Sequence, residues 1–184
     1  MSDLKENLHS QIEFARHSYD NQQAIIRQLD TKAGVFIALL VFLVTEAIPL
    51  ARDVSAKLQW VGRGSVSSWL YVGSAVFLAI GFIATAIYVQ RVIRPRGSEY
   101  ATDSVGLMFA NDILRHGNPE KYHEAAAGAS EAALLRSLTA EIFQLSAIVK
   151  RKTEAIRAAW RPALFSFVMW AFNSLLSIFI LSWK

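Results

Sequence analysis

The stretch that decides the fold is residues 162–183, PALFSFVMWAFNSLLSIFILSW, which carries no charge between Arg161 and Lys184. An α-helix needs about 20 apolar residues to cross the hydrocarbon of a bilayer. This stretch has that length, and it predicts a membrane-spanning helix. Pro162, as a first-turn or kink residue, is expected to mark the joint with the helix that precedes it.

Two further apolar stretches predict spans over residues 66–90 and 33–51. The first of these lies between Arg63 and Arg91 and holds no charge. The second contains Glu46, and a carboxylate costs roughly 2.5–3.5 kcal/mol at the centre of a spanning helix and less near the interface. Glu46 stands near the far end of its span, where it is either an interface residue or a polar element of an assembled pore.

The orientation follows from the distribution of Lys and Arg, because cytoplasmic segments are enriched in both. Residues 1–32 hold 4, residues 52–63 hold 3, residues 91–161 hold 11, and Lys184 is the last of the 19. The predicted topology places both long polar segments in the cytoplasm and the C-terminus outside. The net charge of +4 is explained in this way, without a nucleic-acid partner.

Apolar side chains recur at alternating spacings of three and four in both cytoplasmic segments, which predicts amphipathic helices. The first seam runs from Leu8 to Ala33, with Gln22 as a polar interruption, and the second runs from Leu135 to Trp160. The expected fold class is an all-α membrane protein with long amphipathic cytoplasmic helices. Its single domain, residues 1–184, divides into a cytoplasmic helix (1–32), first span (33–51), outer loop (52–65), second span (66–90), cytoplasmic helical region (91–161) and third span (162–183).

Three polar residues at or inside the membrane are candidates for switching or packing. Lys32 is placed to extend its ammonium group to the membrane surface. Asp30 gains nothing from an anionic leaflet, so we expect it to pair with a basic residue of the other cytoplasmic helix. Asn173 lies near the bilayer centre, where buried amides join helices by hydrogen bonds, although a pore-lining role remains open.

The cytoplasmic segments carry no catalytic signature and no strong metal motif. The chain has no cysteine, no phosphate-binding glycine loop and no nucleophile motif, so we expect neither an enzyme nor a cofactor. His9, Glu13 and His17 recur every four residues, but a solvated helix face explains them better than a metal. Lys150, Arg151 and Lys152 form a basic run that either touches anionic headgroups or binds a phosphate.

Two motifs resemble those of one family. Residues 28–34, QLDTKAG, lead into the first span, and residues 138–152, LTAEIFQLSAIVKRK, precede the last. Together with the order of parts, which is two spans, a polar segment and a third span, they resemble the transmembrane effectors of Pycsar antiphage systems. The resemblance extends from about residue 22 to residue 176.

This resemblance implies a bacterial inner-membrane protein, activated by a cyclic pyrimidine monophosphate (cyclic UMP or cyclic CMP) from a partner cyclase. It also implies membrane damage that kills the infected cell before phage matures. Because three helices enclose no wide pore, a homo-oligomer is expected. A ligand-independent membrane scaffold, or a small channel with a cytoplasmic coiled coil, is the alternative.

The ligand residues are chosen on chemistry, because a cyclic nucleotide carries one phosphate charge and a flat base. Basic side chains bind phosphate. We therefore predict Arg115, Lys150, Arg151 and Lys152 as phosphate contacts and Asn111 as a base contact.

Overall fold

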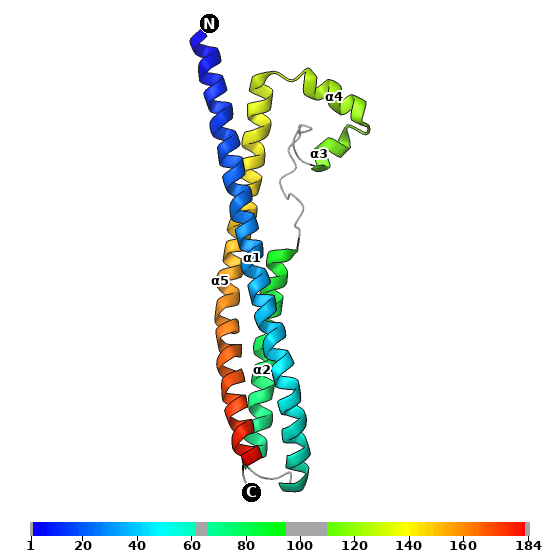
Figure 1. Ribbon diagram of the computed structural model, residues 1–184. Coiled ribbons are helices and arrows are strands. Elements are labelled where there is room, and N and C mark those ends of the chain that lie inside the picture. The colour runs from blue at the N-terminus through cyan, green and yellow to red at the C-terminus, as the bar shows by residue number, and fades with distance from the viewer. Residues whose placement is uncertain (1, 62–65, 95–109, 183–184) are drawn as a thin grey trace. The chain divides into compact units, whose positions relative to one another are not determined.

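Every element that the structure describes is an α-helix. The computed structural model describes the backbone of residues 2–61, 66–94 and 110–182, and the side chains of residues 7–57, 66–94 and 113–182. The helices, shown in Figure 1, are α1 (Ser2–Val61), α2 (Val66–Ile93), α3 (Ala110–Arg115), α4 (Pro119–Ala127) and α5 (Glu131–Ser182).

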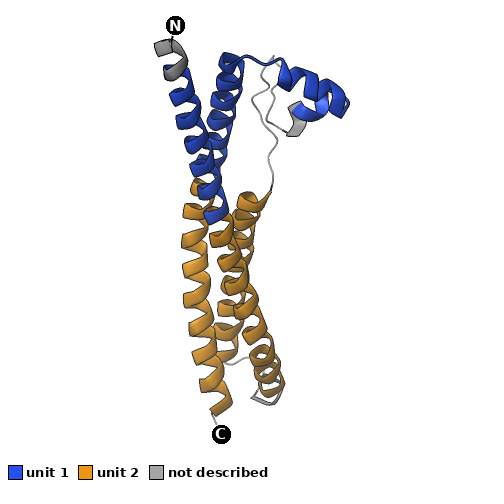
Figure 2. Ribbon diagram, turned by 45° about the horizontal axis from the view of Figure 1, so that its top comes forward, with its two compact units in different colours: residues 1–28, 95–151 blue, residues 29–94, 152–184 orange. Residues whose placement is uncertain are grey.

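The helices divide into two compact units (Figure 2). The first, here called the polar unit, comprises residues 1–28 and 95–151, and the second, the apolar unit, comprises residues 29–94 and 152–184. Helices α3 and α4 belong to the polar unit and α2 belongs to the apolar unit. Helices α1 and α5 contribute residues to both, because neither is interrupted at the boundary.

The apolar unit contains three helices that are long and apolar enough to cross a membrane. The most apolar windows of α1, α2 and α5 have mean hydropathies of 2.3, 2.2 and 2.0. Large apolar side chains such as Phe77, Ile83 and Leu175 are exposed, which suits a surface that faces lipid. The prediction of an all-α protein with three such helices is confirmed.

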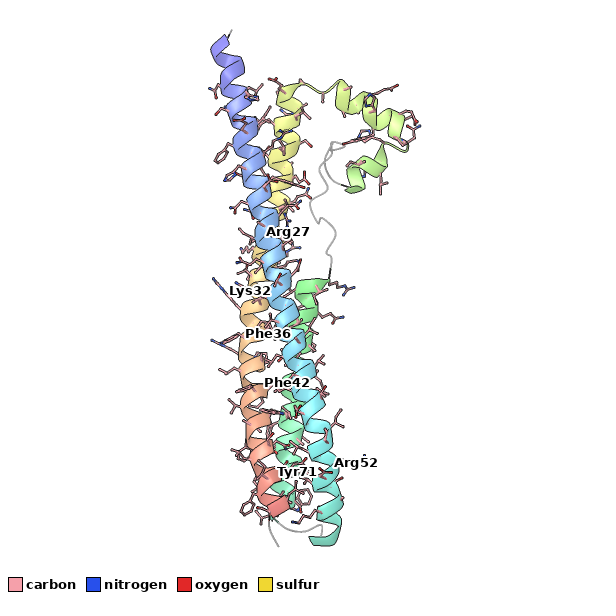
Figure 3. All side chains as sticks on the ribbon, in the orientation of Figure 1. Arg27, Lys32, Phe36, Phe42, Arg52 and Tyr71 are labelled. Carbon is pink, nitrogen blue, oxygen red and sulfur yellow. The ribbon has the colours of Figure 1, made fainter. Side chains whose placement is uncertain are left out.

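Small side chains let the three apolar helices approach closely. Ala33 of α1 and Ala159 and Ala163 of α5 are fully or almost fully buried, and they pack with Phe36 of α1 and with Val89 and Val92 of α2. A second cluster joins Val54 of α1, Tyr71 of α2 and Ile180 of α5. Phe36 and Tyr71 are labelled in Figure 3. Dispersion contacts hold helices together in lipid, where burial of apolar surface gives little driving force.

The expected outer loop over residues 52–65 is helical as far as Val61. Helix-forming residues fill this segment up to Gly62, and Val54 is anchored between Tyr71 and Ile180. Packing of Val54 therefore extends α1 beyond the predicted end of the first span. Residues 52–61 of the expected outer loop are thus helical, and residues 62–65 lie outside the described part.

Both internal prolines lie within continuous helices. Pro49 is inside α1 and Pro162 is inside α5, so the expected joint at Pro162 does not interrupt the helix. A proline removes one backbone N–H from the helical ladder. The Ser166 hydroxyl donates to the Pro162 carbonyl at 2.8 Å, which adds a local bond beside this position.

In the polar unit, the N-terminal part of α1 packs along the first turns of α5. Ala15 of α1 and Leu138 and Leu145 of α5 are buried, and the other seam positions between Leu8 and Ile26 are partly buried. A turn at residues 117–119 separates α3 from α4: Gly117 has a positive φ of 82°, and the Asn118 side chain caps α4 by accepting from the Lys121 N–H at 2.8 Å.

Candidate functional site

The polar unit has a buried polar centre between α1 and α5. The carboxylate residue Glu141 is 4% exposed and Gln144 is 6% exposed, and both lie on α5. Tyr19 of α1 is hydrogen-bonded to Glu141, and the Gln23 amide donates to the Tyr19 hydroxyl at 2.6 Å. A carboxylate, a phenol and glutamine amides thus occupy this part of the contact between α1 and α5.

Tyr19 stays neutral in this setting. Burial, followed by the negative charge of Glu141, raises the pKa of Tyr19 above its usual value. The neutral phenol can therefore donate to the Glu141 carboxylate at physiological pH. A hydrogen bond to a charged group contributes about 1.5–3 kcal/mol, which helps to offset the desolvation of the carboxylate.

The polar centre is not fully satisfied within the described residues. The Gln22 Oε1 atom is buried and has no hydrogen-bond partner there. A buried acceptor without a donor costs about 1–3 kcal/mol. This packing of α1 on α5 therefore leaves one buried acceptor without a donor.

An open apolar groove lies beside this centre and has a volume of about 570 Å³. Its walls are Ser10, Gln11, Phe14, Ala15 and Ser18 of α1 and Leu135, Thr139 and Ile142 of α5. Small-molecule sites have about this size. No Lys or Arg lines the groove, so a phosphate bound there would have no cationic partner.

The pairing expected of Asp30 is present in the apolar unit. The Lys152 ammonium donates to Asp30 Oδ1, with 15% of the Lys152 side chain and 46% of the Asp30 side chain exposed. The pair ties α1 to α5 where their apolar segments begin. A phosphate at Lys152 would compete with Asp30 for the same ammonium group.

The other predicted phosphate residues do not form one cradle with Lys152. Lys150 is exposed and Arg151 is half-buried, and consecutive helical residues project about 100° apart. Arg115 is exposed at the end of α3, and the side chain of Asn111 lies outside the described residues. None of these residues lines the apolar groove between α1 and α5.

Asn173 is buried and joins α5 to α2, as expected of an amide inside the membrane. Its Nδ2 donates to the Ser74 hydroxyl at 2.7 Å, and the Ser74 hydroxyl donates to the Tyr71 carbonyl at 2.8 Å. The Ser177 hydroxyl in turn donates to the Asn173 carbonyl at 2.8 Å. Lys32, the remaining switch candidate, is exposed on α1 (Figure 3).

Helices α2 and α5 also approach closely at Gly81. A methyl group on Gly81 would lie 2.5 Å from Ser166 Oγ and 3.1 Å from Phe165 Cδ1. The two contacts are Ser74 with Asn173 and Gly81 with Ser166. Gly81 follows Ser74 by seven residues on α2, whereas Ser166 precedes Asn173 by seven residues on α5. Helices α2 and α5 are therefore antiparallel, with polar and close contacts two turns apart.

The histidine pattern near the N-terminus does not gather a metal site. His9 Nε2 lies 3.5 Å from Glu13 Oε1, and the two side chains are 74% and 70% exposed. Within the described residues, no group of three His, Cys, Asp or Glu side chains is placed to hold a metal ion.

Sequence reasoning missed the polar centre around Tyr19 and Glu141. Two signals were present. Gln22 interrupts the first seam, and Glu141 lies three residues after Leu138 and four before Leu145, which is a seam spacing. A charged residue is usually assigned to the solvent-exposed face of a helix, even where its spacing fits the apolar seam. Only the structure shows that Glu141 is buried.

The chain was compared with protein families, curated proteins and solved structures. The Pycsar effector protein domain, PycTM, matches residues 14–181. Neither the curated proteins nor the solved structures give a match.

Proposed function

This chain belongs to the Pycsar transmembrane effector family, and from this premise we propose that its polar unit senses a cyclic pyrimidine monophosphate and its apolar unit acts on the membrane. Members of the family disrupt membranes in antiphage defence, are activated by cyclic pyrimidine nucleotides and are not enzymes. The system includes a cyclase that makes the signal.

The observation that carries the proposal is the continuity of α1 and α5. Each helix contributes residues to the polar unit and to the apolar unit without a break. A change in how the two helices pack at Tyr19 and Glu141 can therefore pass along each helix as a rotation or a shift.

The ligand acts on this equilibrium by binding one packing of α1 and α5 better than the other. The phosphate contacts of this proposal are Arg115, Lys150, Arg151 and Lys152, and the base contact is Asn111. Because the four cations form no single cradle in this structure, the proposal requires binding to bring them together, with Lys152 leaving Asp30. Cyclic UMP or cyclic CMP fits this chemistry. The Gln22 oxygen is buried without a hydrogen-bond donor, which is unfavourable for the packing of α1 on α5. This supports the proposal that the packing seen here is a resting one, which ligand binding replaces.

The active form in this proposal is a homo-oligomer in the bacterial inner membrane. Three helices enclose no wide pore, and α1, α2 and α5 all expose large apolar side chains that neighbouring copies can cover. The excess of Lys and Arg in residues 1–32 and 91–161 favours a cytoplasmic polar unit, where the cyclase product is made.

The test is dye release from liposomes that contain the purified protein. Cyclic UMP, cyclic CMP, cyclic AMP and cyclic GMP are added separately, with linear UMP and CMP as matched controls for charge and base. We expect release with one cyclic pyrimidine nucleotide and none without it.

Two results would contradict the proposal. Release that is equal with and without nucleotide indicates a constitutive channel. No release with any nucleotide, from protein whose helicity and insertion are verified, indicates a scaffold.

A further inference from the structure

Three cations, one from each long helix, stand at one end of the apolar unit. Lys32 of α1, Arg91 of α2 and Arg161 of α5 are all exposed. Each lies one or two residues from a buried member of the cluster around Phe36 and Val89, which joins the three helices. The three cations therefore lie at a similar depth in the unit, and we call them the basic belt.

The basic belt lies next to the surface that faces lipid. Each of its cations has an exposed apolar residue three or four positions away on the same helix, toward the middle of the unit, and these residues are Val35, Ile87 and Leu164. Residues at this spacing share one face of a helix. Each cation is therefore placed where the apolar surface ends, which is the level of the headgroups of a bilayer.

The positive charge of the belt is not balanced by nearby carboxylates. The belt and its cluster lie within three short segments, residues 31–36, 88–94 and 159–163. These segments also contain Arg94 but no Asp or Glu. Asp30, which directly precedes the first segment, pairs with Lys152. Glu154 has Arg157 three residues after it on α5, and charges at this spacing offset each other.

The other end of the apolar unit shows no such excess within the residues that the structure describes. Helix α1 carries Arg52 and Lys57 there, with Asp53 between them (Figure 3). The Lys57 ammonium donates to the Leu181 carbonyl at 2.7 Å. The excess of exposed cations thus belongs to one of the two membrane surfaces.

Aromatic side chains accompany the belt at the same depth. The Arg91 guanidinium lies 5.3 Å from the centroid of the Tyr88 ring. Trp160, which directly precedes Arg161, is 61% exposed, and its ring packs edge-on against Phe36 with the centroids 6.1 Å apart. Trp and Tyr are enriched at the level of the headgroups, because one end of each side chain is apolar and the other is polar. Cations and aromatic residues therefore indicate the same level.

We infer that the basic belt binds the headgroups of anionic phospholipids, so that the chain prefers anionic to zwitterionic lipid at this surface. The occupant is a lipid, because each cation stands beside an exposed apolar side chain that can contact the acyl chains of the same molecule. Each Lys or Arg close to an anionic membrane surface strengthens the attraction by roughly fivefold. The belt shares no residue with the phosphate contacts proposed above, and the inference goes beyond the proposed function.

The lipid preference of the unaltered protein is the first measurement. The full chain is reconstituted into phosphatidylcholine without nucleotide. A trace of spin-labelled phosphatidylglycerol or spin-labelled phosphatidylcholine then reports the fraction of each lipid whose motion the protein restricts. We expect phosphatidylglycerol to associate several-fold more strongly than phosphatidylcholine, and raised salt to reduce this preference, because salt screens exposed charges.

Removal of the belt's charge is the second measurement. A variant that combines Lys32→Gln, Arg91→Gln and Arg161→Gln is expected to associate equally with the two lipids. A second variant keeps the charge by combining Lys32→Arg, Arg91→Lys and Arg161→Lys, and it is expected to keep the preference. The matched control makes the same change of charge on exposed residues of the polar unit and also keeps the preference; it combines Arg16→Gln, Lys121→Gln and Arg136→Gln.

Three outcomes overturn the inference. The unaltered protein could associate equally with both lipids. The glutamine variant of the belt, with its helicity verified by circular dichroism, could keep the full preference. The polar-unit control could lose as much of the preference as the belt variant does, which would show an effect of net charge alone. Failure of the proposed function is a different result, because the lipid preference is measured without nucleotide.

Discussion

The ion pair with Asp30 engages the Lys152 ammonium group, to which the proposed function also assigns a phosphate contact. The two side chains are 46% and 15% exposed, so water screens the pair and its contribution to stability is about 1 kcal/mol or less. A weak, partly exposed contact of this kind is suited to exchange, because a phosphate can replace the Asp30 carboxylate at the Lys152 ammonium. The pair links ligand binding to the point where the apolar segments begin.

Removing the Asp30 charge is expected to make activation easier. In Asp30→Asn, the nucleotide concentration for half-maximal dye release falls by up to roughly fivefold, which corresponds to about 1 kcal/mol for an exposed pair. In Lys152→Gln the required concentration rises, because a phosphate contact is lost. Arg157→Gln, which removes an exposed cation from the same helix, is the control. Lys152 would be excluded as a phosphate ligand by two results together. Asp30→Asn would leave the nucleotide concentration for half-maximal release unchanged, and Lys152→Gln would require the same concentration as Arg157→Gln.

Helices α2 and α5 are joined by a hydrogen bond and by a close contact. The Asn173 amide reaches Ser74, and seven residues away Gly81 leaves room for Ser166. In lipid, hydrogen bonds and close contacts of small residues hold helices together. The hydrogen bond and the close contact therefore hold α2 against α5.

A methyl group at the close contact is expected to separate these two helices. Gly81→Ala places a Cβ 2.5 Å from Ser166 Oγ, and such overpacking costs about 1–3 kcal/mol. The thermal unfolding midpoint in detergent should therefore fall. Gly73→Ala is the matched control on the same helix, because nothing lies within 4 Å of its added Cβ. Adding Ser166→Ala to Gly81→Ala should restore part of the loss; equal midpoints for the Gly81 and Gly73 variants would disprove the close contact.

On the scale of the whole molecule, the chain has two units that share two continuous helices. The polar unit contains Tyr19 and Glu141, and the apolar unit contains the three helices able to cross a membrane. If a signal passes between the units, α1 and α5 are the elements that carry it. A break in either helix should therefore separate binding from membrane damage.

A proline at the unit boundary tests this coupling. Gln28 is exposed and is the last residue of the first segment of the polar unit. Gln28→Pro removes a helical hydrogen bond and costs about 3 kcal/mol in a helix interior. We expect this variant to bind the activating nucleotide by calorimetry but to release no dye, whereas Gln28→Ala does both. Dye release by Gln28→Pro at the level of Gln28→Ala would show that coupling does not need an unbroken α1.

The sequence predicted the features that depend on composition and spacing. Charge-free runs of about 20 residues indicate membrane helices because lipid offers no partner for charges. The two motifs at residues 28–34 and 138–152 led to the correct family. The pairing of Asp30 and the helix-joining contact of Asn173 were also foreseen, because an ionised or amide group at such a depth needs a partner.

By itself, then, the sequence determined the all-α class, the three apolar helices and the family, since each follows from local pattern. Only the tertiary structure decided which side chains meet. It identified Lys152 as the partner of Asp30, buried Glu141 beside Tyr19, and extended α1 to Val61 through the packing of Val54. That extension leaves Glu46 well inside α1 rather than near the end of the helix. These features depend on contacts between residues far apart in the chain, which helical periodicity does not specify.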